Sequence, residues 1–261
     1  MNRLSSLFNR KPTAPKSLAD EDTAPPRGPE GAIIYAVGDI HGRDDLLTKM
    51  IDLIETDAAR SGKKAATVVF LGDFVDRGMG SRAVIERLIT RPPGDVDTIF
   101  LKGNHEEALL SFIADAPQNE QWLRFGGIET LQSYGISTEL IERDIDEARE
   151  VFAQSFPATH RAFLNSLQFS HTVGDFYFCH AGIRPGVPLA AQAIDDLMWI
   201  REPFLSSSAD HGKVIVHGHS ITDDVEVRDN RIGLDIGAFA SDRLACLRIE
   251  DDNLSFLYAE A

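Results

Sequence analysis

Three short apolar runs, spaced about 30 residues apart, each end in glycine followed by a polar side chain. The runs are Ala32–Val37, Thr67–Leu71 and Thr98–Leu101, and they end in Gly38-Asp39, Gly72-Asp73 and Gly103-Asn104. Between them, residues 44–58 and 81–89 repeat apolar side chains at helical spacing. This order predicts parallel strands joined by right-handed helical crossovers, and therefore an α/β fold.

Two later apolar runs, Asp175–His180 and Lys213–His217, also read as strands that end in histidine. Ligands of an open α/β sheet bind outside the carboxyl ends of its strands. We therefore expect the polar clusters at five strand ends to converge on one site. The side chains expected there are Asp39, His41, Asp73, Asn104, His180 and His219.

The sequence His217-Gly218-His219 leaves one member of the site open. Residues two apart on a strand point to the same face, so either histidine could be the ligand. The histidine that is not a ligand would contact the ligands and not the metal.

The side chains expected at the site are oxygen and nitrogen donors, which suit Mn²⁺, Fe or Zn²⁺. Two divalent ions carry four positive charges, and two aspartates with a bridging hydroxide carry three negative ones. A net charge of about +1 therefore remains at the site. That local charge would attract phosphate even though 26 Lys and Arg against 41 Asp and Glu give the chain a net charge of −15. A pair of metals about 3.5–4 Å apart can clamp both oxygens of an in-line displacement and generate hydroxide at neutral pH.

The composition excludes several classes of protein. A net charge of −15 repels nucleic acid, and no apolar stretch approaches the roughly 18 residues of a membrane span. The two cysteines, Cys179 and Cys246, lie in apolar runs without the spacing of a disulfide scaffold. We expect a cytoplasmic monomer with no nucleic-acid partner and no integral membrane association.

The chain divides into a leader and one catalytic domain. Residues 1–30 hold five of the 12 prolines and no core pattern, so we expect a disordered leader whose removal changes little. Residues 31–261 would form the domain, with a helical insertion at about 118–170 over the site. The tail, 224–260, predicts antiparallel strands that extend or stack on the first sheet.

The motifs Gly-Asp-Ile-His-Gly (38–42), Gly-Asp-Phe-Val-Asp-Arg-Gly (72–78) and Gly-Asn-His-Glu (103–106) resemble those of the phosphoprotein phosphatase superfamily of calcineurin-like metallophosphoesterases. The nearest likeness is to small bacterial and bacteriophage-type serine/threonine phosphatases, which share the patterns at Trp122–Gly127 and Trp199–Arg201. The resemblance implies a fold of two stacked mixed β-sheets flanked by helices.

The resemblance also implies a role for each site residue. Asp39 and His41 would hold a first metal, Asp73 would bridge, and Asn104, His180 and His219 would hold a second. The ions would be Mn²⁺, with Fe or Zn as alternatives. His105 would donate a proton to the leaving group, paired with Asp76, while Arg77 and Arg201 would grip phosphate oxygens.

The implied activity is hydrolysis of phosphate monoesters, foremost phosphoserine and phosphothreonine in proteins, by attack of a hydroxide held by the metals. The alternatives are a bis(5'-nucleosyl)-tetraphosphatase and a broad-specificity phosphoesterase. The tetraphosphatases typically carry another residue, often Ala, where Asp76 stands. A non-catalytic scaffold on this fold would be expected to lose a ligand or the His105–Asp76 pair, and neither is lost.

Overall fold

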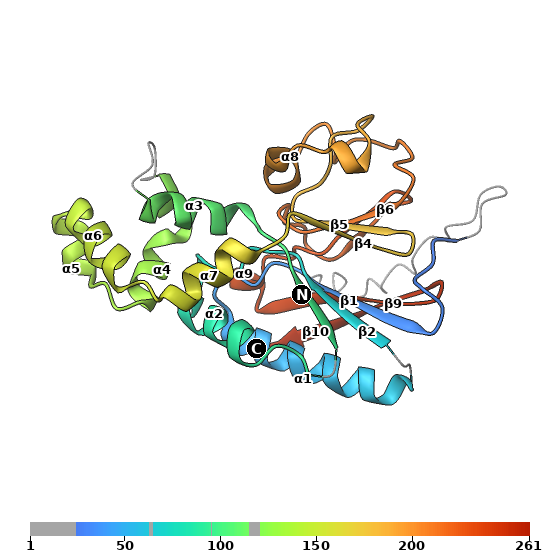
Figure 1. Ribbon diagram of the computed structural model, residues 1–261, viewed down its shortest axis with the longest axis horizontal. Helices are drawn as coiled ribbons and strands as arrows, with labels where there is room; N and C mark the ends of the chain where they lie inside the picture. The colour runs from blue at the N-terminus through green and yellow to red at the C-terminus, as the bar shows by residue number, and fades with distance from the viewer. Residues whose placement is uncertain (1–24, 63–64, 95, 115–120) are drawn as a thin grey trace, which may run out of the picture.

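The computed structural model describes residues 25–62, 65–94, 96–114 and 121–261 and contains two five-stranded sheets stacked face to face (Figure 1). The order of strands is β10-β9-β1-β2-β3 in the first sheet and β4-β5-β6-β8-β7 in the second. The α/β fold with two stacked mixed sheets is thereby confirmed.

The first sheet is built around the three parallel strands expected from the sequence, β1 (Ala32–Val37), β2 (Ala65–Phe70) and β3 (Asp97–Phe100). The crossover helices are α1 (Asp44–Ser61) and α2 (Ser81–Thr90). A hairpin of β9 (Arg243–Glu250) and β10 (Asn253–Glu260) adds to β1 in antiparallel sense, as predicted for part of the tail.

The second sheet takes up the rest of the tail, and here one expectation is wrong. Its strands are β4 (Ser170–Val173), β5 (Phe176–Cys179), β6 (Val214–His217), β7 (Glu226–Val227) and β8 (Arg231–Gly233). β8 pairs with β6 in parallel, not antiparallel, sense because the chain crosses back before β8 through the short edge strand β7. β8 therefore ends at the same edge as β5 and β6.

Alternation along the strands explains how the layers stack. In β1, Ile33, Tyr35 and Val37 pack against the helices of the first sheet. Ile34 and Ala36 point the other way, into the core that the two sheets share. Both faces of β1 are thus buried, so this strand is continuously apolar and ends where the polar side chains of the site begin.

Helices cover the outer faces. After α3 (Asn104–Ile113), the described part of the predicted insertion is helical from η1 (Leu123–Gly127) to Ser166, and β4 then begins at Ser170. The outer face of the second sheet packs against residues of α8 (Ile194–Trp199). The remaining helices are α4 (Ile128–Ser133), α5 (Thr138–Arg143), α6 (Ile145–Ser155), α7 (Ala158–Ser166), η2 (Leu189–Ala191) and α9 (Ala238–Ser241).

Residues 1–24 of the predicted leader lie outside the described residues. Its last six residues contact both sheets: the Gly28 amide donates to Asp251 O (2.8 Å), and the Arg27 amide donates to the Asp175 carboxylate (2.9 Å). The chain is therefore fixed to the domain a few residues before β1.

Removal of residues 1–24 is expected to leave turnover and Tm nearly unchanged, because this segment lacks the apolar pattern of a core. Removal of residues 1–30 also deletes the bonds of Arg27 and Gly28, each worth about 1 kcal/mol, and should lower Tm by a few degrees. Thermal unfolding and hydrolysis of p-nitrophenyl phosphate by both truncations test this. If the shorter truncation loses most activity, the leader belongs to the working protein.

Two further findings concern the chain as a whole. In the part of the chain that the structure describes, no helix combines the length and the apolar character needed to cross a bilayer. Cys179 and Cys246 are both buried and unpaired, which agrees with the expectation that no disulfide scaffold exists.

Candidate active site

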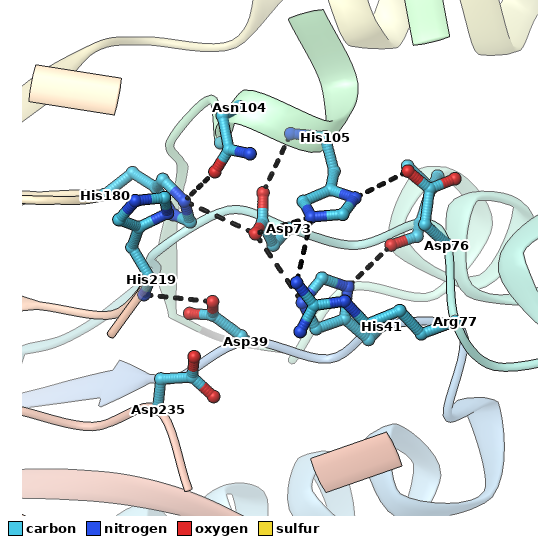
Figure 2. A network of polar contacts seen from close by, with 12 residues as sticks. Asp39, His41, Asp73, Asp76, Arg77, Asn104, His105, His180, His219 and Asp235 are labelled. Atoms are coloured by element: carbon cyan, nitrogen blue, oxygen red, sulfur yellow. Dashed lines mark hydrogen bonds and ion pairs between the residues drawn. The ribbon is translucent and has the colours of Figure 1, made fainter. Parts of the chain in front are cut away.

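The six expected ligand residues lie together at the carboxyl ends of β1, β2, β3, β5 and β6, where both sheets contribute (Figure 2). Asp73 stands at the centre. Its Oδ2 atom lies 3.6 Å from His41 Nε2 and 3.4 Å from His180 Nε2. The backbone amide of His219 donates to Asp39 Oδ2 at 3.0 Å, which ties the two sheets together at the site.

The histidine rings are oriented as metal ligands usually are. His41 Nδ1 donates to Val75 O at 2.8 Å, and His180 Nδ1 donates to Leu71 O at 2.9 Å. These bonds leave the Nε2 lone pairs facing Asp73. Asn104 Oδ1 also lies 2.9 Å from His180 Nε2. Acceptor atoms this close to one another need a proton or a cation between them.

Several buried polar atoms at the site have no hydrogen-bond partner among the described residues. They include Asp39 Oδ1, His41 Nε2 and His219 Nε2. Two groups of donor atoms, each within 4.8 Å, share Asp73: one with His180 and His219, the other with His41 and His105. The orphaned acceptors and the donor chemistry fit a pair of divalent metal ions.

Burial keeps two of the histidine rings neutral, whereas the carboxylates draw a positive charge to the third. Burial lowers the pKa of His41 and of His219 to about 3, so both rings are neutral. Burial also lowers the pKa of His180, but Asp73 and other carboxylates raise it to about 10 overall. The site therefore attracts a positive charge to His180, and a metal ion would take the place of that proton.

The backbone of the site is strained. Residues with φ in the left-handed region include His41 (45°), Asp73 (51°), Asp76 (74°), Arg77 (66°) and His219 (64°). Such a conformation costs of order 1–3 kcal/mol for a non-glycine residue and persists only where the surroundings enforce it. The chain turns sharply after β1, β2 and β6 and so aims these side chains into one space.

Glu106 holds two of these turns, which the sequence analysis did not anticipate. Its buried carboxylate accepts hydrogen bonds from the amides of Asp73 (2.9 Å), Phe74 (2.7 Å) and Gly103 (2.9 Å). Glu106 is the third residue of α3, and a glutamate that reaches back to the amide before the helix is half of a capping box. α3 therefore begins at Asn104.

His105 and Asp76 form the expected pair. His105 Nδ1 donates to Asp76 Oδ2 at 2.6 Å, and Trp122 Nε1 and Thr130 Oγ1 also donate to the Asp76 carboxylate at 2.6 Å each. Burial lowers the pKa of His105, but Asp73 and Asp76 raise it above its ordinary value overall. The pair therefore favours the imidazolium, the form that can donate a proton.

Arg77 lies at the edge of the same cluster. Its Nη2 atom lies 3.3 Å from His105 Nε2, and its guanidinium lies over the half-buried Phe239 ring, 4.8 Å from the ring centroid. The Arg77 amide donates to Gly126 O at 3.1 Å, and a Cβ on Gly126 would lie 2.4 Å from the Arg77 nitrogen. The Gly-Gly pair after Trp122 thus lets helix η1 approach Arg77.

Arg201 is less closely placed. It lies on an exposed segment after α8. Burial and the charge of His180 lower the pKa of His219 most, and the charge of Arg201 lowers it further. Arg201 therefore lies near the site, at its exposed side.

The structure separates His217 from His219. His217 is the last residue of β6, and its ring packs against Phe204 with centroids 5.1 Å apart. His219 follows the strand in a left-handed conformation, and its ring lies 5.2 Å from that of His180. Only His219 is in the cluster of donor atoms, as the resemblance implied.

A carboxylate that the sequence analysis missed also lies at the site. Asp235 follows β8 and is 1% exposed. The signal was present, since Ile232-Gly233-Leu234-Asp235 is another apolar run that ends in aspartate. The antiparallel strands expected for the tail would not bring the Asp235 side chain to this edge of the sheet, whereas the parallel pairing of β8 with β6 does.

Two stacked mixed sheets with a cluster of Asp, His and Asn at their strand ends define the metallophosphoesterase class. The calcineurin-like phosphoesterase family matches residues 33–249, and the chain belongs to that family.

Two curated proteins are similar to part of the chain. It is 32% identical over 152 residues to the symmetrical bis(5'-nucleosyl)-tetraphosphatase of Acidovorax ebreus (strain TPSY), which is 58% of this chain and 44% of that protein. The symmetrical bis(5'-nucleosyl)-tetraphosphatase of Acidovorax sp. (strain JS42) matches equally. The chain thus spans less than half the length of these relatives.

Solved structures share the fold at low identity. A protein assigned as a diadenosine tetraphosphatase gives a TM-score of 0.58 at 20% identity, over 87% of this chain and 93% of that one. A serine/threonine phosphatase from Saccharomyces cerevisiae gives 0.53 at 17% (88% and 80%). A cold-active protein-tyrosine phosphatase of a psychrophilic Shewanella gives 0.55 at 16% (86% and 80%).

Proposed function

We propose that this metallophosphoesterase hydrolyses phosphate monoesters, foremost phosphoserine and phosphothreonine in proteins. The observation that supports this choice is the 2.6 Å bond between His105 and the buried Asp76. Trp122 and Thr130 also donate hydrogen bonds to the Asp76 carboxylate, so three donors, including His105, fix its position.

The leaving group explains why this pair matters. A serine or threonine alkoxide is strongly basic and must receive a proton as the P–O bond breaks, whereas a phosphate-chain leaving group is far less basic. A positioned general acid contributes typically about 10²–10⁴-fold. His105, with its pKa raised by Asp73 and Asp76, is the group that can supply this proton.

The other side chains bind and orient. Asp39, His41, Asp73, Asn104, His180 and His219 would hold two divalent ions, which supply charge neutralisation and water activation when bound. Arg77 would bind phosphate oxygens through its planar fork. Because Arg77 Nη2 lies 3.3 Å from His105 Nε2, phosphate binding would draw the guanidinium aside and leave a protonated Nε2 free to face the leaving oxygen.

Hydrolysis of bis(5'-nucleosyl)-tetraphosphates is the second candidate, because the curated relatives at 32% identity carry that activity in their names. A broad-specificity phosphoesterase would accept both substrate types. Mn²⁺ as the ion, with Fe or Zn as alternatives, and a cytoplasmic monomer complete the proposal.

A substrate panel is expected to separate these candidates. Metal-stripped full-length protein, reloaded with Mn²⁺, Zn²⁺ or Fe²⁺ in turn, should show higher kcat/KM on phosphoserine and phosphothreonine peptides than on diadenosine tetraphosphate. Release of phosphate and separation of nucleotides by chromatography give the two rates. A preference for the dinucleotide would replace the proposed substrate, and no turnover with any ion would overturn the proposed activity.

A further inference from the structure

A sixth strand end contributes to the site. β8 lies beside β6, and the Leu234 amide donates to His217 O at 2.8 Å as the chain leaves the sheet. Asp235 is the next residue, so it emerges from the same edge of the second sheet as His219.

Asp235 lies close to Asp39 across the junction of the two sheets. Gly38 precedes Asp39 and Leu234 precedes Asp235, and a Cβ on Gly38 would lie only 2.6 Å from Leu234 O. The two strand ends therefore touch. Figure 2 shows both carboxylates on the same side of the centre.

In each of these two carboxylates, one oxygen accepts a hydrogen bond and the other has no hydrogen-bond partner among the described residues. Asp235 Oδ1 accepts from the Gly237 amide at 2.9 Å, and Asp39 Oδ2 accepts from the His219 amide at 3.0 Å. Asp235 Oδ2 and Asp39 Oδ1 are buried without a hydrogen-bond partner among the described residues. Two neighbouring buried carboxylates in this state repel each other, and a cation relieves the repulsion.

A turn-forming role would explain only one of the two carboxylate oxygens of Asp235. The bond from Gly237 to Oδ1 is one that an asparagine could also make. It gives no reason for a charged second oxygen to be buried beside Asp39. The charge, not the turn, is therefore the feature that needs a function.

We propose that Asp235 is part of the metal centre and supplies a further negative charge to the ion held by Asp39 and His41. The inference rests on the metal centre of the proposed function. Asp235 acts on the ion and not on the phosphate, so it is a positioning residue and its effect is on metal affinity.

Calorimetric titration of metal-stripped full-length protein with Mn²⁺ tests this. Asp235→Asn should weaken binding of one ion by about tenfold or more, in the range seen when supporting carboxylates of metal sites are removed. The matched control is Asp229→Asn, the same change at an exposed turn six residues earlier, which should bind like the wild type.

Thermal unfolding distinguishes a metal role from a merely structural one. Without metal, Asp235→Asn should be at least as stable as the wild type, because the repulsion with Asp39 is gone and the acceptor for Gly237 is kept. Its gain in Tm on adding Mn²⁺ should be smaller. A lower Tm without metal, together with an unchanged gain, would overturn the inference.

The remaining outcomes are also decisive. If Asp235→Asn does not fold, Asp235→Ser, which keeps a hydroxyl acceptor near Gly237, undergoes the same two measurements. Equal Mn²⁺ affinities in the variant and the wild type would overturn this inference alone. A wild type that binds no divalent ion would overturn the proposed function and this inference with it.

Discussion

Asp73→Asn is expected to lower the affinity for both metal ions by more than about 100-fold, and turnover with it. Loss of a supporting group around a metal ligand already costs about 10–100-fold, and the proposed function makes Asp73 a ligand shared by both ions. Its Oδ2 atom faces His41 Nε2 at 3.6 Å and His180 Nε2 at 3.4 Å, and it belongs to both groups of donor atoms. The amide in the variant would keep the shape and lose the charge.

Metal content after dialysis, measured by mass spectrometry, and kcat/KM on p-nitrophenyl phosphate check this result. Asn104→Ala should weaken only the ion near His180, since Asn104 Oδ1 lies beside that ring alone. If Asp73→Asn still bound two ions and turned over normally, Asp73 would not be the ligand that bridges the ions.

His105→Asn should lower kcat/KM on a phosphoserine peptide by about 10²–10⁴-fold and distinctly less on p-nitrophenyl phosphate. The alkoxide needs a proton as it leaves, and nitrophenolate needs little help. Asp76→Asn should show the same leaving-group bias in weaker form, because Asp76 only orients and charges the imidazole through the 2.6 Å bond.

A structural role for His105 predicts another pattern. Losses would then be equal on both substrates, and Tm would fall because a buried ring had been removed. Measurement of both substrates with both variants, at matched metal content, separates the two roles. Equal losses with intact metal binding would exclude His105 as the general acid.

The strand ends were predictable because parallel strands impose a common direction. Once Asp39, Asp73 and Asn104 were seen to follow apolar runs at regular spacing, the topology alone brought them to one edge. The resemblance added the assignment of roles, which stays a prediction. The structure brings the assigned side chains together and places Arg201 on an exposed segment near them.

What the sequence pattern left open or missed depends on how the folded chain runs. Alternation places His217 and His219 on one face only while the strand continues, and the left-handed turn at His219 ends that rule. Asp235 was hidden because β8 is three residues long and its parallel pairing with β6 depends on contacts far along the chain. Glu106 was seen in a motif, but its bonds to other loops required the folded structure.

The bond between the His219 amide and Asp39 joins positions 180 residues apart in the chain. Asp39, His41 and Asp73 emerge from the ribosome long before His180 and His219, so a growing chain cannot assemble the proposed two-ion centre until both histidines have been made. The centre is completed only when the second sheet has docked on the first. Ions that bind the docked state alone stabilise it by mass action. Metal supply would then shift the newly made protein toward the state in which the two sheets are docked, in addition to any part it has in catalysis.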